Sequence, residues 1–236
     1  MKNSITCPSC SHQNSFYAYT CKNCRSFLRD KIFNIDLWDV IGTLVETPGK
    51  AFKQIIFADH KNFIFFIWVF IAAKMLVNIR FVSLLSIGEI ITTTSVYVSY
   101  IIVFSVFIIY IHLFSFSSKL INNALNIDTR FRDTLAIISF SLLPNIAGIV
   151  FIFILELVVF GPYLFSVNPT PFEIKGLAAY FFAGAELLLI IWSFILSLSA
   201  LKVQTNSWTY SIITTTIFYS VLALIIYFSS KILFII

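Results

Sequence analysis

TRFRDTLAIISFSLLPNIAGIVFIFILELVVF, residues 129–160, is the stretch that decides the fold class of this chain. Residues 134–160 within it number 27, and Glu156 is the one ionisable side chain among them. A helix of that length rises about 40 Å, which exceeds the roughly 30 Å of hydrocarbon in a lipid bilayer. The stretch therefore predicts a helix that enters a membrane.

Pro144 interrupts this stretch, because proline lacks the backbone N–H that a continuous helix needs. We expect a short amphipathic entry helix up to Leu143 that lies partly in the membrane interface. The true span then begins at about Asn145 and ends near Phe165.

The composition of the whole chain indicates that lipid is its solvent. Hydrophobic residues make up 59% of the 236 positions and charged residues only 11%, whereas soluble domains carry about a quarter charged residues. A soluble core could not hide this much apolar surface. The net charge of +5 is spread along the loops, which suits an anionic membrane leaflet better than nucleic acid.

Four further apolar stretches are each long enough to cross a bilayer, and they cover residues 63–85, 94–116, 176–201 and 208–230. The chain is therefore predicted to be an all-α integral membrane protein, a five-span transmembrane helix bundle. We expect three parts: a small head in residues 1–30, amphipathic interfacial helices in 31–62, and the membrane domain in 63–236. We detect no internal repeat, which argues against the duplicated halves of common secondary transporters.

The positive charges predict the orientation of the spans. With a cytoplasmic N-terminus, twelve of the sixteen Lys and Arg residues lie on the cytoplasmic side. Only Arg80, Lys175 and Lys231 then lie outside, and Lys74 lies within a span. We therefore expect a multi-pass protein with its N-terminus in the cytoplasm and its C-terminus outside, in the cell membrane if the source is prokaryotic.

All four cysteines of the chain lie in the head, as two C-x-x-C pairs separated by ten residues: Cys7, Cys10, Cys21 and Cys24. Two such pairs supply four thiolates that can close tetrahedrally around Zn²⁺, and a closed four-thiolate site is structural. Two disulfides are the alternative, but they require an oxidising compartment. We expect a short zinc ribbon whose folding is coupled to metal binding.

The head also resembles the short zinc-ribbon modules at the N-terminus of many prokaryotic membrane proteins. It differs from them where glycine usually follows each C-x-x-C pair, because Ser11 and Arg25 stand there instead. Its aromatic and basic residues could contact nucleic acid. We favour the interpretation that the aromatic residues pack over the cysteine pairs and that the head docks a protein partner.

Residues 31–62 predict two short amphipathic helices, with Thr47 as the N-cap and Pro48 as the first residue of the second helix. Trp38, Lys50 and Lys53 suit the headgroup layer of a membrane. The helices are expected to lie on the membrane, and the alternative is that they pack on the spans from below.

Ionisable side chains inside spans are hypotheses of function by default. Lys74 and Glu186 are both expected near the bilayer midplane, and Arg80 and Glu156 at a common level closer to the outside. Two charge pairs that bridge spans are the structural interpretation. A proton or ion path that uses Glu156 and Glu186 is the functional one.

Several features together resemble the Yip (Ypt-interacting protein) domain family: five spans, a cytoplasmic N-terminal region, the segment ETPGKAFKQII in residues 46–56, and FRDTLAIISFSLLP in residues 131–144. The likeness covers about residues 36–236, and the zinc head is typical of prokaryotic members. Eukaryotic members are associated with Rab-type GTPases and vesicle trafficking. Their Asp-Leu-Tyr-Gly-Pro motif is absent here, so Rab binding is not carried over, and prokaryotic members as a group have no assigned activity.

No paired-histidine metal motif, serine nucleophile elbow or glycine-rich phosphate loop occurs in the sequence, so we do not expect an enzyme. The leading hypothesis is an adaptor or membrane-organising factor whose zinc ribbon docks a cytosolic protein. The alternative is a small transporter or channel for ions or protons that uses Glu156 and Glu186. Lipid is an expected partner, nucleic acid is not, and homo-oligomer formation stays open.

Overall fold

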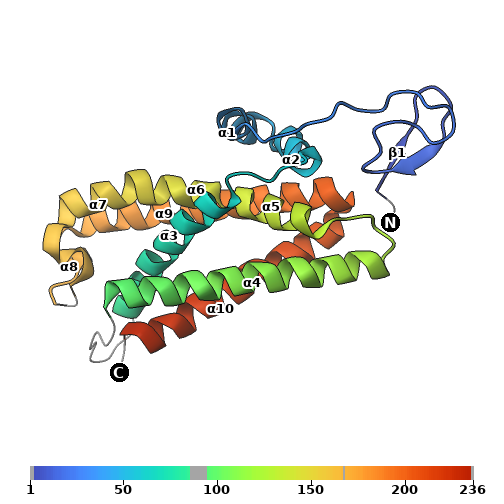
Figure 1. Ribbon diagram of the computed structural model, residues 1–236. Helices are drawn as coiled ribbons and strands as arrows, with labels where there is room; N and C mark the ends of the chain where they lie inside the picture. The colour runs from blue at the N-terminus through green and yellow to red at the C-terminus, as the bar shows by residue number, and fades with distance from the viewer. Residues whose placement is uncertain (1–2, 86–94, 167, 235–236) are drawn as a thin grey trace. The chain divides into compact units, whose positions relative to one another are not determined.

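The computed structural model describes residues 3–85, 95–166 and 168–234, with the backbone alone for residues 84, 85 and 234 (Figure 1). Five helical segments among these residues are long and apolar enough to cross a membrane. They are α3 (Ile64–Leu85), α4 (Val96–Ala124), the interrupted segment Phe131–Phe165, α9 (Gly176–Thr205) and α10 (Trp208–Phe234). The predicted five-span fold class is confirmed, although the predicted start of the second span, residue 94, lies outside the described residues.

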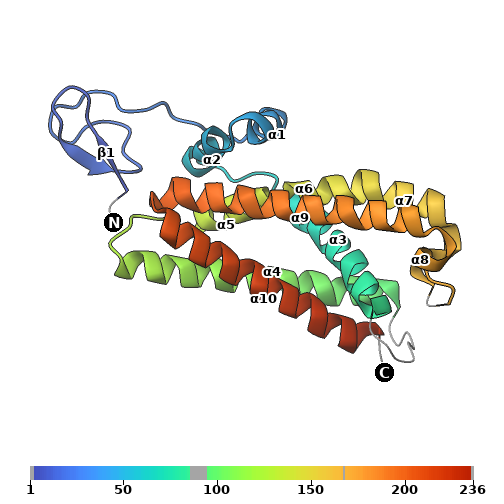
Figure 2. The ribbon, with the colours of Figure 1, turned by 180° about the vertical axis from the view of Figure 1, so that it is seen from behind.

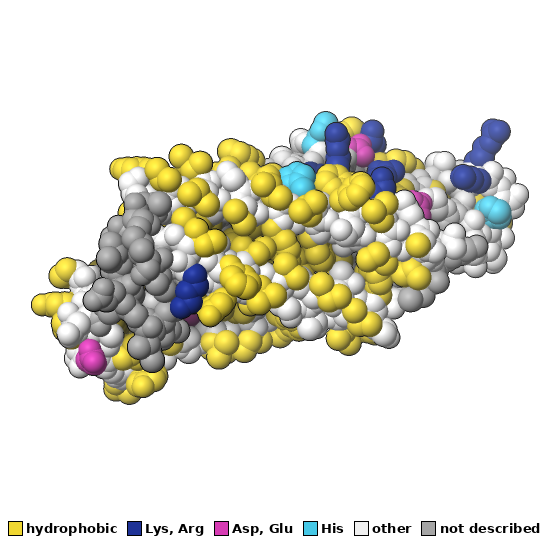
Figure 3. Space-filling view, turned by 90° about the horizontal axis from the view of Figure 1, so that it is seen from below, with side chains coloured by type: hydrophobic (Ala, Val, Ile, Leu, Met, Phe, Trp, Pro, Cys, Tyr) yellow, Lys and Arg dark blue, Asp and Glu magenta, His cyan; other side chains and the backbone are white. Residues whose placement is uncertain are grey.

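Large apolar side chains are exposed along these helices, as a lipid solvent requires. Figure 3 shows hydrophobic side chains over most of one face of the molecule, with few charges among them. Tyr97, Val158 and Leu177 are among the most exposed of these side chains. A soluble monomer rarely exposes contiguous apolar surface of this kind. The chain is an integral, multi-pass membrane protein.

The third span is interrupted where the sequence predicts a break. Leu142 separates α5 from α6, and Pro144 lies in the first turn of α6. Irregular turns follow, so that the segment consists of α5 (Phe131–Ser141), α6 (Leu143–Ala147), the π-helix η1 (Gly148–Ile152), α7 (Phe153–Phe160) and the 3₁₀-helix η2 (Gly161–Phe165). The predicted break is confirmed.

The entry helix α5 is enclosed by protein over most of its length and is not amphipathic as predicted, whereas its position in the membrane interface stays a prediction. Every residue from position 133 to 142 is buried, and Arg132 in the first turn is exposed. Its polar side chains find partners inside the protein instead. Gln204 donates through Nε2 to Thr134 Oγ1 at 2.9 Å, and Ser139 donates to the carbonyl of Leu135. These internal hydrogen bonds allow the hydroxyl groups of this helix to be enclosed by protein.

The chain divides into two compact units, which we describe separately. Unit 1 contains Met1–Ile64, Ile111–Phe140 and Leu196–Thr215, and unit 2 contains Phe65–Tyr110, Ser141–Ile195 and Thr216–Ile236. The head and the two approach helices therefore share unit 1 with the ends of α4, α9 and α10 that fall in it. The boundaries predicted at residues 30 and 62 both lie inside this unit.

In unit 1, the head holds the antiparallel pair β1 (Ser4–Thr6) and β2 (Gln13–Ser15), and α1 (Leu37–Glu46) and α2 (Pro48–Phe57) follow. The Asp36 side chain caps α1 by accepting from two backbone N–H groups, and Pro48 opens α2. The apolar face of α2 is fully buried in protein: Ala51, Phe52, Ile55 and Ile56. Of the two arrangements left open by the sequence, α2 therefore has the packed one.

In unit 2, two helix pairs pack closely. The parts of α4 and α10 that belong to unit 2 are in contact, because Tyr110 donates to the carbonyl of Phe218 at 2.6 Å and the two rings stack; the two ribbons cross in Figures 1 and 2. Helix α7 lies along α9, where the rings of Phe160 and Phe182 meet edge to face. Aromatic contacts of this type provide packing energy between helices in lipid, where the hydrophobic effect does not drive helix association.

Candidate metal centre and intramembrane charge cluster

The two C-x-x-C pairs of the head form the same backbone turn twice. The N–H of Ser11 donates to the carbonyl of Cys7, and the N–H of Arg25 donates to that of Cys21, both at 3.0 Å. Ser11 and Arg25 both have positive φ, 54° and 58°. This conformation favours glycine, and this chain adopts it with a serine and an arginine.

The four cysteine sulfur atoms lie within 4.8 Å of one another. Cys7 and Cys24 Sγ are 3.5 Å apart, and Cys10 and Cys21 Sγ are 3.6 Å apart. A tetrahedral Zn²⁺ with Zn–S bonds near 2.3 Å places its sulfurs about 3.8 Å apart. All four cysteines are free thiols, so the predicted ligand set is assembled and the disulfide alternative is not formed. The cluster fits a metal ion held by four thiolates.

Hydrogen bonds around the cluster already favour some of its thiolates. Ser26 Oγ lies 3.0 Å from Cys7 Sγ, and this contact lowers the pKa of Cys7 to about 6. A backbone N–H of Cys24 lowers the pKa of Cys21. The backbone of His12 favours the Cys10 thiolate, yet hydrogen bonds with Cys24 and Cys21 raise its pKa to about 11. Because neighbouring thiols do not all ionise unaided, a bound cation would complete the set.

A network of polar contacts attaches the head to the rest of unit 1. The buried Asn3 side chain donates to the carbonyls of Asp128 and Gln204, both at 2.8 Å, and accepts from the Asp128 N–H. The Arg130 guanidinium lies 4.0 Å from the Tyr17 ring centroid, and its backbone N–H donates to the Tyr17 hydroxyl. Sequence reasoning missed this attachment, because its members lie more than a hundred positions apart.

Aromatic residues of the head contact α2, and their predicted packing over the cysteine pairs stays a prediction. Phe16 contacts Phe57 of α2, with ring centroids 5.1 Å apart. Arg29 lies between Tyr19 and Phe57, 4.1 Å from each ring centroid. These contacts stack Phe16 and Arg29 of the head onto Phe57 of α2.

Lys61, between α2 and α3, makes several contacts inside unit 1. Its ammonium forms an ion pair with Asp133 at 2.9 Å, and the two side chains are 9% and 2% exposed. Burial lowers the pKa of Lys61, which the Asp133 carboxylate opposes. The same ammonium donates to three carbonyls at the end of α2, those of Ile55, Ile56 and Ala58. One side chain therefore joins α2 to the start of the third span.

Replacing Lys61 with methionine should destabilise unit 1. The change leaves Asp133 as a buried charge without its partner and removes the donor to the α2 carbonyls. We expect a loss of about 2–3 kcal/mol, below the ~3–5 kcal/mol typical of fully buried pairs because Lys61 keeps some contact with water. Thermal unfolding in detergent measures the loss, and Lys53→Met on the exposed side of α2 is the control. Equal stability of the two variants would contradict the prediction.

In unit 2, the structure brings Lys74 and Glu186 together. The Lys74 ammonium lies 2.5 Å from Glu186 Oε1, and Lys74 is almost fully buried. The pair joins α3 to α9 within the spans. An ion pair in this environment needs close geometry to offset the cost of removing two charges from water.

The π-helix provides the space for this pair. A Cβ atom on Gly148 would lie 2.9 Å from Leu189, 3.2 Å from Lys74 Cε and 3.6 Å from Glu186 Oε1. Any larger residue at this position would therefore displace the pair or its neighbour. π-helical turns of this kind occur frequently at functional sites. Sequence reasoning did not identify Gly148 as a residue of this site. An isolated glycine inside an apolar helical stretch was the signal that could have indicated it.

The structure does not bring Arg80 and Glu156 together, so the second predicted pair is absent from the described residues. Arg80 donates to the carbonyl of Phe165 at 3.1 Å. Glu156 is buried, its Oε2 has no hydrogen-bond partner among the described residues, and its carboxylate interacts electrostatically with Lys74 and Glu186. The prediction compared depths along regular helices, whereas the π-helix changes the face that later residues present.

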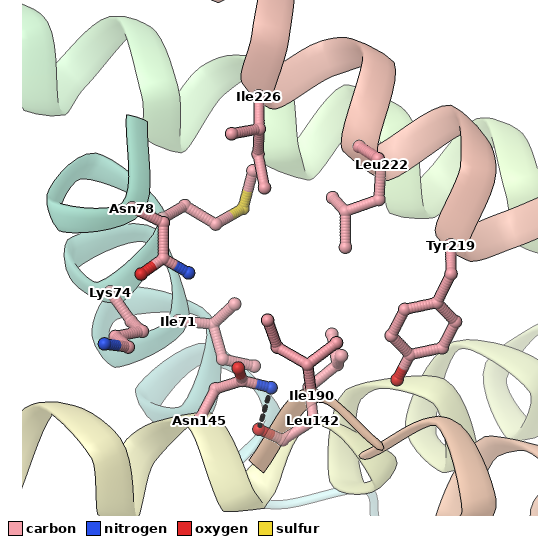
Figure 4. Close-up of a pocket in the computed structure, with 11 residues that line it drawn as sticks. Ile71, Lys74, Asn78, Leu142, Asn145, Ile190, Tyr219, Leu222 and Ile226 are labelled. Atoms are coloured by element: carbon pink, nitrogen blue, oxygen red, sulfur yellow. Dashed lines mark hydrogen bonds between the residues drawn. The ribbon is translucent and has the colours of Figure 1, made fainter. Parts of the chain in front are cut away.

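A cavity of about 200 Å³ lies beside this charge cluster in unit 2 (Figure 4). Lys74 and Asn78 of α3 line it, together with Asn145 of α6 and apolar side chains of α10. Asn145 donates to the carbonyl of Leu142 and, at 2.9 Å, to the hydroxyl of Ser193. The walls of the cavity are therefore mostly apolar, and the amide groups of Asn78 and Asn145 and the Lys74 side chain lie among them.

Comparisons with known proteins found no match for this chain, whether with protein-family models, with curated proteins or with solved structures. The resemblance to the Yip domain family therefore stays a prediction.

Proposed function

We propose that this protein is a non-enzymatic membrane adaptor, whose head binds one structural Zn²⁺ and docks a cytosolic protein. The observation that carries the proposal is the two-sided environment of the head. Asn3, Tyr17 and Arg29 attach it to the rest of unit 1. The turn of the second cysteine pair, residues 22–25, is exposed instead. A module that is held on one side and open on the other can recruit a partner to the membrane.

The exposed side has the chemistry of a protein-docking surface. Lys22 and Arg25 supply positive charge, and Phe27 exposes 63% of its surface close by. Arginine and aromatic residues are enriched among the residues that dominate binding energy at interfaces. The partner surface that fits is acidic, with an apolar pocket for Phe27.

The proposal includes a structural role for Zn²⁺ and no catalytic role. Four thiolates close the coordination sphere of Zn²⁺, so no position is left for water or substrate. The cytoplasmic position of the head follows from the distribution of Lys and Arg among the loops. Membership of the Yip domain family is an additional hypothesis, and none of the contacts described above depends on it.

Crosslinking and pull-down from native membranes tests the docking proposal. Wild type should capture a cytosolic protein that Lys22→Glu combined with Arg25→Glu no longer captures, because the charge reversal repels an acidic surface. Lys53→Glu, an exposed change outside the head, is the matched control and should still capture it. Equal capture by all three proteins would overturn the proposal.

Transport of ions or protons is the second candidate, and the buried charges of unit 2 favour it. Glu186 pairs with Lys74, and Glu156 lies nearby without a hydrogen-bond partner for Oε2. Buried carboxylates of this kind form proton relays in membrane pumps and transporters. Flux through reconstituted protein that needs Glu186 and no partner protein would establish this candidate and overturn the adaptor proposal.

A further inference from the structure

Three ionisable side chains interact with one another in the spans of unit 2, and their charges do not balance: Lys74 and Glu156 are buried and the Glu186 side chain is 17% exposed. Lys74 is positive, and Glu156 and Glu186 are negative when ionised, so a fully ionised cluster carries one excess negative charge. The Lys74 ammonium is already engaged by Glu186 at 2.5 Å. Glu156 is only 4% exposed, and its Oε2 lacks a partner among the described residues. The excess charge therefore resides on Glu156.

A buried carboxylate without a partner is unstable as an anion and needs a positive ligand. A metal cation such as Ca²⁺ requires six or more oxygen ligands. The charged groups that act on Glu156 among the described residues are instead Lys74 of α3 and Glu186 of α9. The Lys74 ammonium would repel a metal cation placed beside it. A proton needs only one carboxylate oxygen, so it is the ligand that fits.

We propose that Glu156 is a proton-binding site within the spans, and that Lys74 changes its partner when the proton leaves. With Glu156 protonated, Lys74 pairs with Glu186, as the structure shows. When the proton departs to solvent, the Glu156 carboxylate becomes the second anion that competes for the Lys74 ammonium. The cluster then holds one positive charge shared between two carboxylates.

Gly148 of the π-helix and a cavity border the Lys74 side chain. A Cβ atom at Gly148 would lie 3.2 Å from Lys74 Cε, so the glycine makes room for the lysine stem. Lys74 also lines the cavity of about 200 Å³, and its ammonium points away from the other labelled lining residues in Figure 4. The proposed change of partner is a shift of this long side chain between two carboxylates.

Infrared spectroscopy of the full chain in lipid nanodiscs at neutral pH tests the proposal through the C=O band of protonated carboxyl groups. Wild type should show this band, and Glu156→Gln should lack it. Glu186→Gln should lack it as well, because the freed Lys74 ammonium then ionises Glu156. Lys74→Met should show about twice the wild-type intensity, because both carboxyl groups are then protonated.

Asp133→Asn is the control, since Asp133 is a buried carboxylate outside this cluster, and its removal should leave the band unchanged. Absence of the band in wild type, or its survival in Glu156→Gln, would overturn the proposal. A band that survives in Glu186→Gln would overturn the change of partner. If Lys74→Met does not fold, the two glutamine variants still decide the result. The measurement depends on neither partner docking nor flux.

Discussion

Removal of the metal should unfold the head and leave the five spans helical. Residues 3–30 hold only two short strands, and a chain of this length rarely buries enough surface to fold alone. Structural Zn²⁺ contributes about 10–16 kcal/mol in zinc-finger peptides at pH 7. This is the largest single contribution expected anywhere in the protein. Its loss should also break the attachment through Asn3 and Tyr17, because both contacts need a folded head.

Metal analysis and limited trypsin digestion together measure this effect. Purified protein should contain one zinc per chain, and a chelator should expose Lys22, Arg25 and Arg29 to cleavage, which requires locally unfolded chain. Cys21→Ser should be cleaved without chelator, whereas His12→Ala, next to the same cluster, should behave as wild type. A chelated protein with an intact head would refute the metal-dependent fold, as would less than half an equivalent of zinc after reducing purification.

The sequence was sufficient to predict the elements whose cause is local. Span length follows from apolar composition, and the break near Pro144 follows from one missing N–H. The four-cysteine cluster follows from the spacing of the cysteines, because two C-x-x-C pairs supply the four thiolates of one metal site. Each of these signals resides in a few consecutive residues, and each has a direct physical reading.

The remainder depends on partners that are distant in the sequence. Asn3 satisfies carbonyls of Asp128 and Gln204, and no local pattern relates these positions. Lys61 reads as a loop cation, and only the fold reveals that it pairs with Asp133. The entry helix α5 was expected to be amphipathic. Its hydroxyl groups instead form hydrogen bonds inside the protein, which composition alone does not show.

The buried charges illustrate both outcomes. Depth along the spans was enough to place Lys74 level with Glu186, because both helices are regular over that distance. Depth along the span did not predict the neighbours of Glu156, because the π-helix at Gly148 changes the face that the following residues present. A periodicity argument assumes one helix type throughout, and a single inserted residue invalidates it beyond that point.

Lys74→Met should lower the stability of the protein by about 3–5 kcal/mol, the usual cost of removing one partner of a buried ion pair. Glu186→Gln should cost less, because its amide still accepts a hydrogen bond and Glu156 can take over the ammonium. The double variant should recover much of the Lys74→Met loss, since no orphan Glu186 carboxylate is left. The interaction energy of this double-mutant cycle should therefore be large.

Thermal or denaturant unfolding in the same detergent measures all members of the cycle, with Lys50→Met as the control for an exposed lysine. If the losses of Lys74→Met and Glu186→Gln simply add in the double variant, the two side chains are not coupled and the prediction is wrong. At a pH high enough to ionise Glu156, adding Glu156→Gln to Lys74→Met should restore part of the loss as well, because the second carboxylate then also loses its cation. If only Glu186→Gln rescues Lys74→Met, the ammonium serves one carboxylate. If both rescue it, the ammonium serves both, as a shared positive charge requires.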